Sequence, residues 1–136
     1  MGRMGNFFQK RSETIYTIFR VLVGLLFLQH GVQKLFGVFG FPAPAPVFSL
    51  MWFAGYIELL GGLAITIGFF TRYAALAGAL EMLIAYFYQH LPKGFFPIVN
   101  QGELSLLFFL SFLILLVHGC GRWGIKSLFP GSKGKK

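Results

Sequence analysis

The chain has 136 residues, of which 56% are hydrophobic and 12% are charged, and its formal net charge is +8. Soluble domains carry about 25% charged residues, so this composition excludes an ordinary soluble domain. Nucleic acid is excluded as a partner because the basic residues lie at the ends of apolar segments, and the single cysteine, Cys120, excludes an internal disulfide bond and a cysteine-based zinc site.

Four apolar stretches predict four transmembrane helices, over about residues 15–36, 50–70, 73–90 and 103–119. A bilayer core of about 30 Å needs roughly 20 helical residues, and lipid offers no water to the backbone, so each stretch must be helical. The first stretch lacks a clear small-residue cleavage site, so we interpret it as a retained helix. We expect an all-α, four-helix membrane bundle in one domain, residues 1–136.

Basic residues indicate how these helices are oriented. Nine of them lie in the N-terminal segment, in the C-terminal segment or, as Arg72, in the link between the second and third helices, all on one side of the membrane. Lys34 and Lys93 lie on the opposite side. The positive-inside rule therefore predicts a multi-pass protein with both termini in the cytoplasm. The basic tail at residues 130–136 is expected to be disordered and to contact anionic lipid.

The two links on the opposite side are rich in phenylalanine and proline. They read "GVFGFPAPAPVFS" and "HLPKGFFPIVNQG". Their phenylalanines are expected either to anchor the links at the membrane surface or to form a lid over a site that faces outward.

Polar residues inside the spans are the candidates for function. Charged residues are costly in the bilayer and mark functional sites by default. The set consists of Arg20, His30, Lys34, Glu58, Glu81 and Glu103.

Small residues share helix faces with Glu58 and Glu81, which predicts that both glutamates point into the bundle and away from lipid. Two close carboxylates do not both ionise without a cation. Our hypothesis is that Arg20 compensates one glutamate while the other holds a proton.

Each candidate also has a structural interpretation. Arg20 with a glutamate can be only a clamp between helices, and His30 can hydrogen-bond a backbone carbonyl. Lys34 can extend to the membrane surface. Glu103 follows Asn100 by three positions, as in a capping box at a helix start.

The sequence carries no sign of a bound redox metal. It has no pair of histidines at matching depths for haem, no CxxC motif and no nucleotide-binding glycine loop. A quinone, in contrast, needs only an apolar slot with hydrogen-bonding or proton-donating groups at its ring oxygens. His30, Lys34, Glu58 and Glu81 are the residues that we expect to provide these groups.

The stretches "RVLVGLLFLQHGVQKLFG", "GYIELLGGLAITIGFFTRYAAL" and "NQGELSLLFFLSFLILLVHGCGRWGI" resemble the DoxX family of small bacterial membrane proteins. The matching positions are Arg20, His30, Gly31, Lys34, Glu58, Gly61, Gly62, Gly68, Thr71, Arg72, Gly102 and Glu103. Gly119-Cys120-Gly121 stands where the family often has Gly-Pro-Gly. The resemblance implies a four-helix membrane bundle in the bacterial inner membrane. Relatives include the DoxD-type subunit of thiosulfate:quinone oxidoreductase, and others are linked with thiol and oxidative stress.

Three functions are left open by the sequence. The first is a quinone-interacting subunit of a membrane redox complex, and the second is a non-catalytic anchor or assembly subunit for a partner protein. The third is a small proton-coupled transporter, for which four short spans favour a homo-oligomer. The sequence assigns no catalytic residue and does not decide whether the chain is an enzyme.

Overall fold

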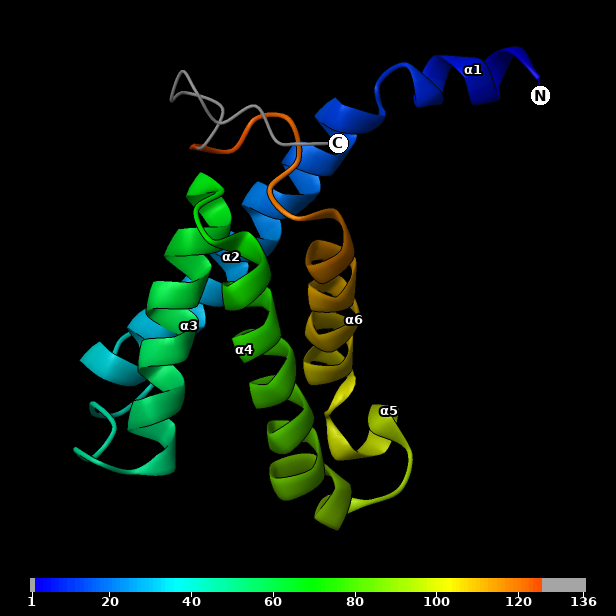
Figure 1. The fold of residues 1–136 in the computed structure, drawn as a ribbon. Helices are drawn as coiled ribbons and strands as arrows, with labels where there is room; N and C mark the ends of the chain where they lie inside the picture. The colour runs from blue at the N-terminus through cyan, green and yellow to red at the C-terminus, as the bar shows by residue number, and fades with distance from the viewer. Residues whose placement is uncertain (1, 126–136) are drawn as a thin grey trace.

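The computed structural model of the protein describes residues 2–125 and contains only helices and their connections in this range (Figure 1). The expectation of an all-α fold is therefore confirmed for these residues. The predicted disorder of residues 130–136 lies outside the described part of the chain.

The N-terminal third of the chain forms two helices. The short α1 (Arg3–Gln9), which we did not predict, buries none of its residues and turns away from α2 (Ser12–Phe36) (Figure 1). Helix α2 begins three residues before the expected start. It ends at Gly37, whose φ of 63° is left-handed and is typical of a helix C-cap.

The central helices form a hairpin with a very short link. Helix α3 (Leu50–Ile67) starts at Ser49, whose side chain accepts a hydrogen bond from the Trp52 backbone nitrogen at 3.1 Å. The left-handed Gly68, with φ of 74°, ends α3 three residues earlier than expected. Helix α4 (Thr71–Ala85) then begins two residues earlier than expected.

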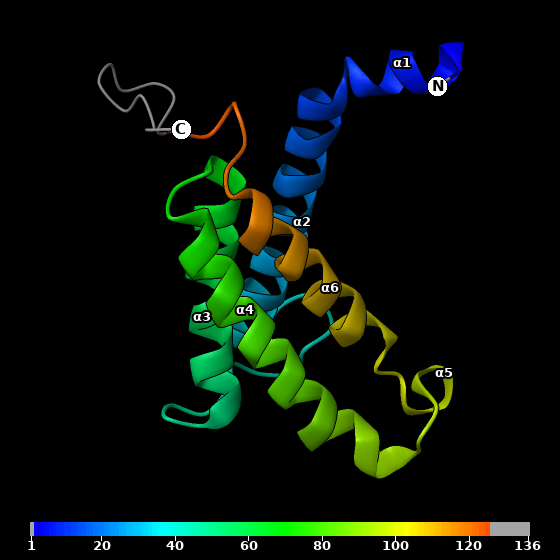
Figure 2. The same cartoon turned by 45° about the vertical axis from the view of Figure 1, so that its right-hand side comes forward.

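Helical structure continues past α4 but changes its pitch. A π-turn, η1 (Tyr86–His90), and a 3₁₀ turn, η2 (Leu91–Lys93), follow directly. The short α5 (Pro97–Asn100), also not predicted, leads to α6 (Glu103–His118). The four longest helices lie in two pairs, α2 with α3 and α4 with α6, which the short α3–α4 link joins (Figures 1 and 2).

Glycines allow the helices of each pair to approach closely. A methyl group on Gly62 of α3 would lie 2.5 Å from the Leu28 nitrogen and 2.7 Å from the Gly24 oxygen of α2. A methyl group on Gly78 of α4 would lie 2.7 Å from the Phe112 ring of α6. Apolar side chains fill the centre between the pairs: Val23, Phe27, Ile65, Ala75, Ala79, Met82, Phe108, Phe112 and Leu115.

The outer surface of the helices is apolar, which fits a lipid environment. Large hydrophobic side chains are exposed along all four of the longest helices, including Leu22, Leu60, Leu76 and Leu107. Within the described residues, α2 and α3 are long and apolar enough to cross a membrane, and α6 is a shorter apolar helix.

Candidate functional site

A cavity of about 680 Å³ lies between the four longest helices, at the end away from α1. Most of its wall is apolar, and it includes Phe27, Ile57, Met82 and Phe108. Every long helix contributes polar residues to the lining, which include His30, Gln33 and Lys34 of α2, Glu58 of α3, Glu81 of α4 and Ser105 of α6. Apolar walls with a few convergent polar groups are typical of a small-molecule binding site.

An ion pair between α2 and α3 is the centre of this polar lining. The Lys34 ammonium donates to both carboxylate oxygens of Glu58, with Nζ–Oε1 and Nζ–Oε2 distances of 2.6 and 2.7 Å. The Glu58 side chain is only 3% exposed, so the expectation that it points into the bundle is correct. The ion pair holds the Lys34 ammonium beside Glu58, so Lys34 does not extend to the membrane surface. Without this cation the buried Glu58 carboxylate would be an uncompensated charge, which is costly.

Glycines hold the two members of this pair in register. A methyl group on Gly31 of α2 would overlap the Leu59 nitrogen and the Gly55 oxygen of α3. A methyl group on Gly55 would in turn lie 3.3 Å from Cβ of Lys34. The backbones of α2 and α3 therefore touch one helical turn from the ion pair, which fixes how Lys34 meets Glu58.

Glu81 adds a second carboxyl group to the same cavity. It lies close enough to Glu58 and Lys34 to interact electrostatically with both. Its Oε2 atom is buried and has no hydrogen-bond partner within the described residues. Buried polar atoms normally have partners, so an unsatisfied carboxyl oxygen marks a place for a ligand group or a proton.

His30 closes the cavity on the side of α6. The His30 ring stands nearly perpendicular to the Phe108 ring, with a centroid distance of 5.8 Å. Phe27 also packs against the Phe108 ring, with a centroid distance of 5.5 Å. The half-buried imidazole lines the cavity together with Lys34 and Glu58, so the structure brings four predicted site residues together: His30, Lys34, Glu58 and Glu81.

The π-turn after α4 shapes the far end of the cavity, and sequence reasoning missed it. Tyr88, Gln89 and His90 of η1 line the cavity, and His90 Nδ1 lies 3.1 Å from the Asn100 carbonyl oxygen. Single π-helical turns are rare and are often found at functional sites. The apolar sequence around it gives no periodic signal for a π-turn.

Asn100 is the buried residue that ties η1 and α5 to the start of α6. Its side chain is inaccessible to solvent, donates to the Gly94 oxygen at 2.8 Å and accepts from the Gly102 nitrogen at 2.8 Å. The predicted capping box with Glu103 is wrong, because Glu103 is the exposed first residue of α6 and the Asn100 oxygen bonds to Gly102. Glu103 does not line the cavity.

Arg20 does not pair with a glutamate, and this prediction is wrong. The fully buried guanidinium donates to the carbonyl oxygens of Ile65 and Thr66 at 2.7 and 2.8 Å, and to that of Trp123 at 3.1 Å. The last carbonyls of a helix have no partner within the helix, so they attract a cation. Arg20 therefore caps α3 and fastens the segment after α6, roughly 20 Å along α2 from Lys34.

Arg72 has a similar capping role at the same end of the bundle. Its Nε and Nη2 atoms donate to the carbonyl oxygens of Leu116 and Val117 at 3.0 Å each, near the end of α6. The sequence indicated Arg72 as a topology signal and as a position that matches the family, but a cation in a short helix link does not reveal which helix end it caps.

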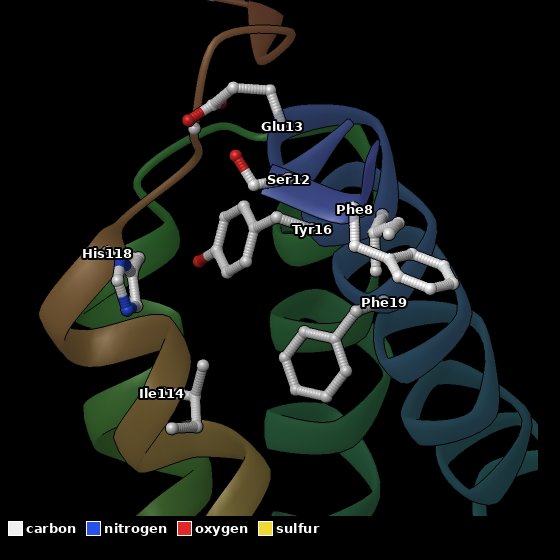
Figure 3. A pocket seen from close by; sticks show the side chains of 9 residues that line it. Phe8, Ser12, Glu13, Tyr16, Phe19, Ile114 and His118 are labelled. Carbon is white, nitrogen blue, oxygen red and sulfur yellow. The ribbon is translucent and has the colours of Figure 1, made fainter. Parts of the chain in front are cut away.

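A second hollow of about 580 Å³ lies between the first turns of α2 and the end of α6 (Figure 3). Two of its polar groups have partners: the Tyr16 hydroxyl donates to the Gly119 oxygen at 2.6 Å, and Glu13 accepts from the Arg122 nitrogen at 3.2 Å. Figure 3 shows Phe19 and Ile114 on opposite sides of it. Among the described residues that line this hollow, no buried side-chain oxygen or nitrogen lacks a partner, in contrast to Oε2 of Glu81 in the first cavity.

Metal binding has no support in the part of the chain that the structure describes. Residues 2–125 contain no group of three or more His, Cys, Asp or Glu side chains arranged to hold an ion. The cavity lining includes one ammonium, two carboxyl groups, two imidazoles and several amide and hydroxyl groups, which suits an organic ligand with carbonyl or hydroxyl oxygens.

The apolar exterior and the internal polar cavity define a helical membrane protein. Residues 15–91 match the family model described as DoxX, and this chain belongs to the DoxX family. It is 34% identical over 137 residues to an uncharacterized protein of Haemophilus influenzae, covering 91% of this chain and 97% of that one. An uncharacterized membrane protein of Mycobacterium tuberculosis is 29% identical over 126 residues, covering 78% of this chain and 76% of that protein. No solved structure matches the chain.

Proposed function

We propose that this DoxX-family membrane protein is a quinone-binding subunit of a membrane redox complex that serves sulfur, thiol or oxidative-stress chemistry. The observation that carries the proposal is the cavity in which Lys34, Glu58 and Glu81 meet among apolar walls, with one Glu81 oxygen unsatisfied. In this proposal a partner protein supplies the electrons.

The proposal places the chain in the bacterial inner membrane with four spans and both termini in the cytoplasm. The first two spans are α2 and α3. The third is the continuous helical stretch from Thr71 to Lys93, which is roughly 35 Å long, and the fourth is α6, at about 24 Å. In this orientation the cavity lies in the outer half of the bilayer.

The cavity fits the chemistry of a quinone head group. Its volume lies inside the range of about 300–1,000 Å³ that is usual for ligand sites. The two ring oxygens of a quinone accept hydrogen bonds, and the Lys34 ammonium and the His30 imidazole are donors on one wall. When bound, a quinone supplies an acceptor for two electrons and two protons.

Glu81 is the residue that we assign to proton transfer. Its carboxyl group can take up or release a proton while Lys34 and Glu58 keep their two short contacts. A positioned carboxyl group within hydrogen-bond reach of the reacting oxygen is what general acid catalysis requires. Glu58, in contrast, is held by the ion pair and orients Lys34.

The test is quinone binding to purified protein in mild detergent. Mass spectrometry of the extracted protein should detect retained quinone, and titration should give a saturable affinity for a dimethoxy-methyl-benzoquinone with a decyl tail. Glu81→Leu should weaken binding about tenfold, which is the loss of one hydrogen bond to a polar ring oxygen. Glu103→Leu is the matched control, because Glu103 is outside the cavity, and equal effects of both changes would remove Glu81 from the site.

A second function, that of an anchor or assembly subunit, is favoured by one observation. Helix α1 buries none of its residues and projects from the bundle, which leaves Met4, Phe7 and Phe8 exposed (Figure 1). If α1 holds a partner protein, deletion of residues 2–9 should abolish recovery of one specific partner and leave quinone binding unchanged. The same loss of the partner with Glu81→Leu would instead link assembly to the cavity.

A further inference from the structure

The cavity wall is not equally closed between each pair of neighbouring helices, and we call the line of contact between two helices a seam. The α2–α3 seam is sealed by direct backbone contact at Gly31 and Gly62. Between α2 and α6 the wall is closed at two levels: the Phe27 ring lies 4.7 Å from that of Phe112 and 5.5 Å from that of Phe108, and the His30 ring lies 5.8 Å from that of Phe108. The α4–α6 seam is sealed where Gly78 meets the Phe112 ring.

The α3–α4 seam is closed only near the hairpin. A methyl group on Gly61 would lie 3.6 Å from the Phe27 ring and 4.0 Å from the Ala74 oxygen, so the two helices are still close at that level. Farther from the hairpin, toward Leu50 at the start of α3 and Ala85 at the end of α4, the two helices diverge in both views of the fold (Figures 1 and 2). The cavity-lining residues on this side are exposed and apolar: Phe53 and Ile57 of α3, and Leu80 and Ile84 of α4.

The connecting segments cover the end of the cavity near the Lys34 side. The Ala45 nitrogen donates to the Lys34 oxygen at 2.8 Å, and Gln33 Nε2 donates to the Phe39 oxygen at 2.8 Å. These bonds hold the link at residues 37–49 over the end of α2 and place the half-buried Phe41 in the cavity wall. The cavity is therefore more accessible from the side than from its end.

The polar residues lie directly behind this lateral opening. Ile57 precedes Glu58 on α3, and Leu80 precedes Glu81 on α4, so each helix contributes an exposed apolar residue and an adjacent carboxyl group that lines the cavity. A ligand seated at the carboxyl groups would have its nearest exit between α3 and α4. In a membrane, that exit leads to the acyl chains.

We propose that the opening between α3 and α4 is a lateral entrance from the bilayer, and that the ligand is an amphipathic molecule whose hydrocarbon tail stays in this opening while its polar ring contacts Lys34 and Glu81. The inference rests on the proposed quinone site and adds the route and the tail. Leu80, Ile84 and Ile57 line the tail's path, and since lipid is as apolar as these side chains, the opening costs little when empty.

The experiment compares two quinones on the same purified protein. The probes are a dimethoxy-methyl-benzoquinone with a decyl tail and the same ring without a tail. Ile57→Trp and Ile84→Trp place a large ring in the opening. Leu60→Trp and Leu76→Trp are matched controls, because these leucines are exposed on the same two helices and do not line the cavity.

The lateral entrance predicts that Ile57→Trp and Ile84→Trp weaken binding of the tailed quinone about tenfold or more and change binding of the bare ring less than about twofold. Retained binding of the bare ring also shows that these variants are folded. If both variants bind both quinones as the wild type does, the entrance is refuted and the quinone site stands. If both variants lose both quinones equally, the opening is not separate from the ring site and the inference fails. If the wild type binds neither quinone, the proposed function itself is refuted.

Discussion

Replacement of Lys34 by methionine is the sharpest test of how the cavity is held together. Methionine keeps most of the side-chain volume and removes the ammonium that donates to both Glu58 oxygens at 2.6 and 2.7 Å. Glu58 would then be an unpaired carboxylate in a nearly inaccessible position. Breaking a buried ion pair in this way costs about 3–5 kcal/mol in the free energy of unfolding.

The measurement is a double-mutant cycle with Lys34→Met, Glu58→Met and the double variant, unfolded by denaturant titration in detergent micelles. Since two apolar side chains can replace a buried ion pair almost without cost, the double variant should recover most of the stability that either single change loses. The exposed Lys10, changed to methionine, is the control and should alter stability by less than about 0.5 kcal/mol. Additive losses in the double variant would show that the pair does not act as a unit, and would refute the ion pair as the organising contact of the cavity.

Three further predictions concern the frame around the site. Arg20→Met should lower the free energy of unfolding by about 3 kcal/mol, because three backbone carbonyl oxygens, one of them in a buried hydrogen bond, lose their donor. Added Glu58→Gln should not restore the stability, and restoration would show that Arg20 does pair with the glutamate. Gly62→Ala should lower the free energy of unfolding by about 1–3 kcal/mol, because the added methyl group forces α2 and α3 apart. Gly61→Ala should be tolerated, because a methyl group there meets no atom closer than 3.6 Å. Equal shifts of the thermal unfolding midpoint in the two variants would contradict the close packing. Asn100→Leu should lower the free energy of unfolding by about 2 kcal/mol or more, because the Gly94 carbonyl oxygen and the Gly102 backbone N–H lose their partner. Denaturant titration measures this loss, and an unchanged stability would contradict the role of Asn100.

The inward direction of Glu58 could be predicted from sequence, and its partner could not. Glycines and alanines on the same helix face indicated close packing, and Gly31, Gly55 and Gly62 do make backbone contacts between α2 and α3. The identity of the cation depended on the register of these contacts. Register is set by packing between two helices and leaves no periodic signal in either one.

The predicted pairing of Arg20 with a glutamate was wrong because backbone carbonyl oxygens compete with carboxylates for a buried guanidinium. The carbonyl oxygens of Ile65 and Thr66 at the end of α3 have no donor within the helix, and both accept hydrogen bonds from Arg20. A guanidinium can donate to several such oxygens at once. Asn100 was missed as a central residue for a related reason, since its partners come from a loop whose path the sequence does not define.

Quinone binding in the cavity can be tested by photo-crosslinking with a quinone that carries a photoreactive group on its ring, followed by peptide mapping of the labelled protein. We expect saturable labelling within residues 50–58 and 80–90, the segments of α3, α4 and η1 that line the cavity, and competition by unlabelled quinone. Labelling confined to residues 8–19 and 114–121, around the hollow in Figure 3, or labelling that does not saturate, would contradict quinone binding in the cavity.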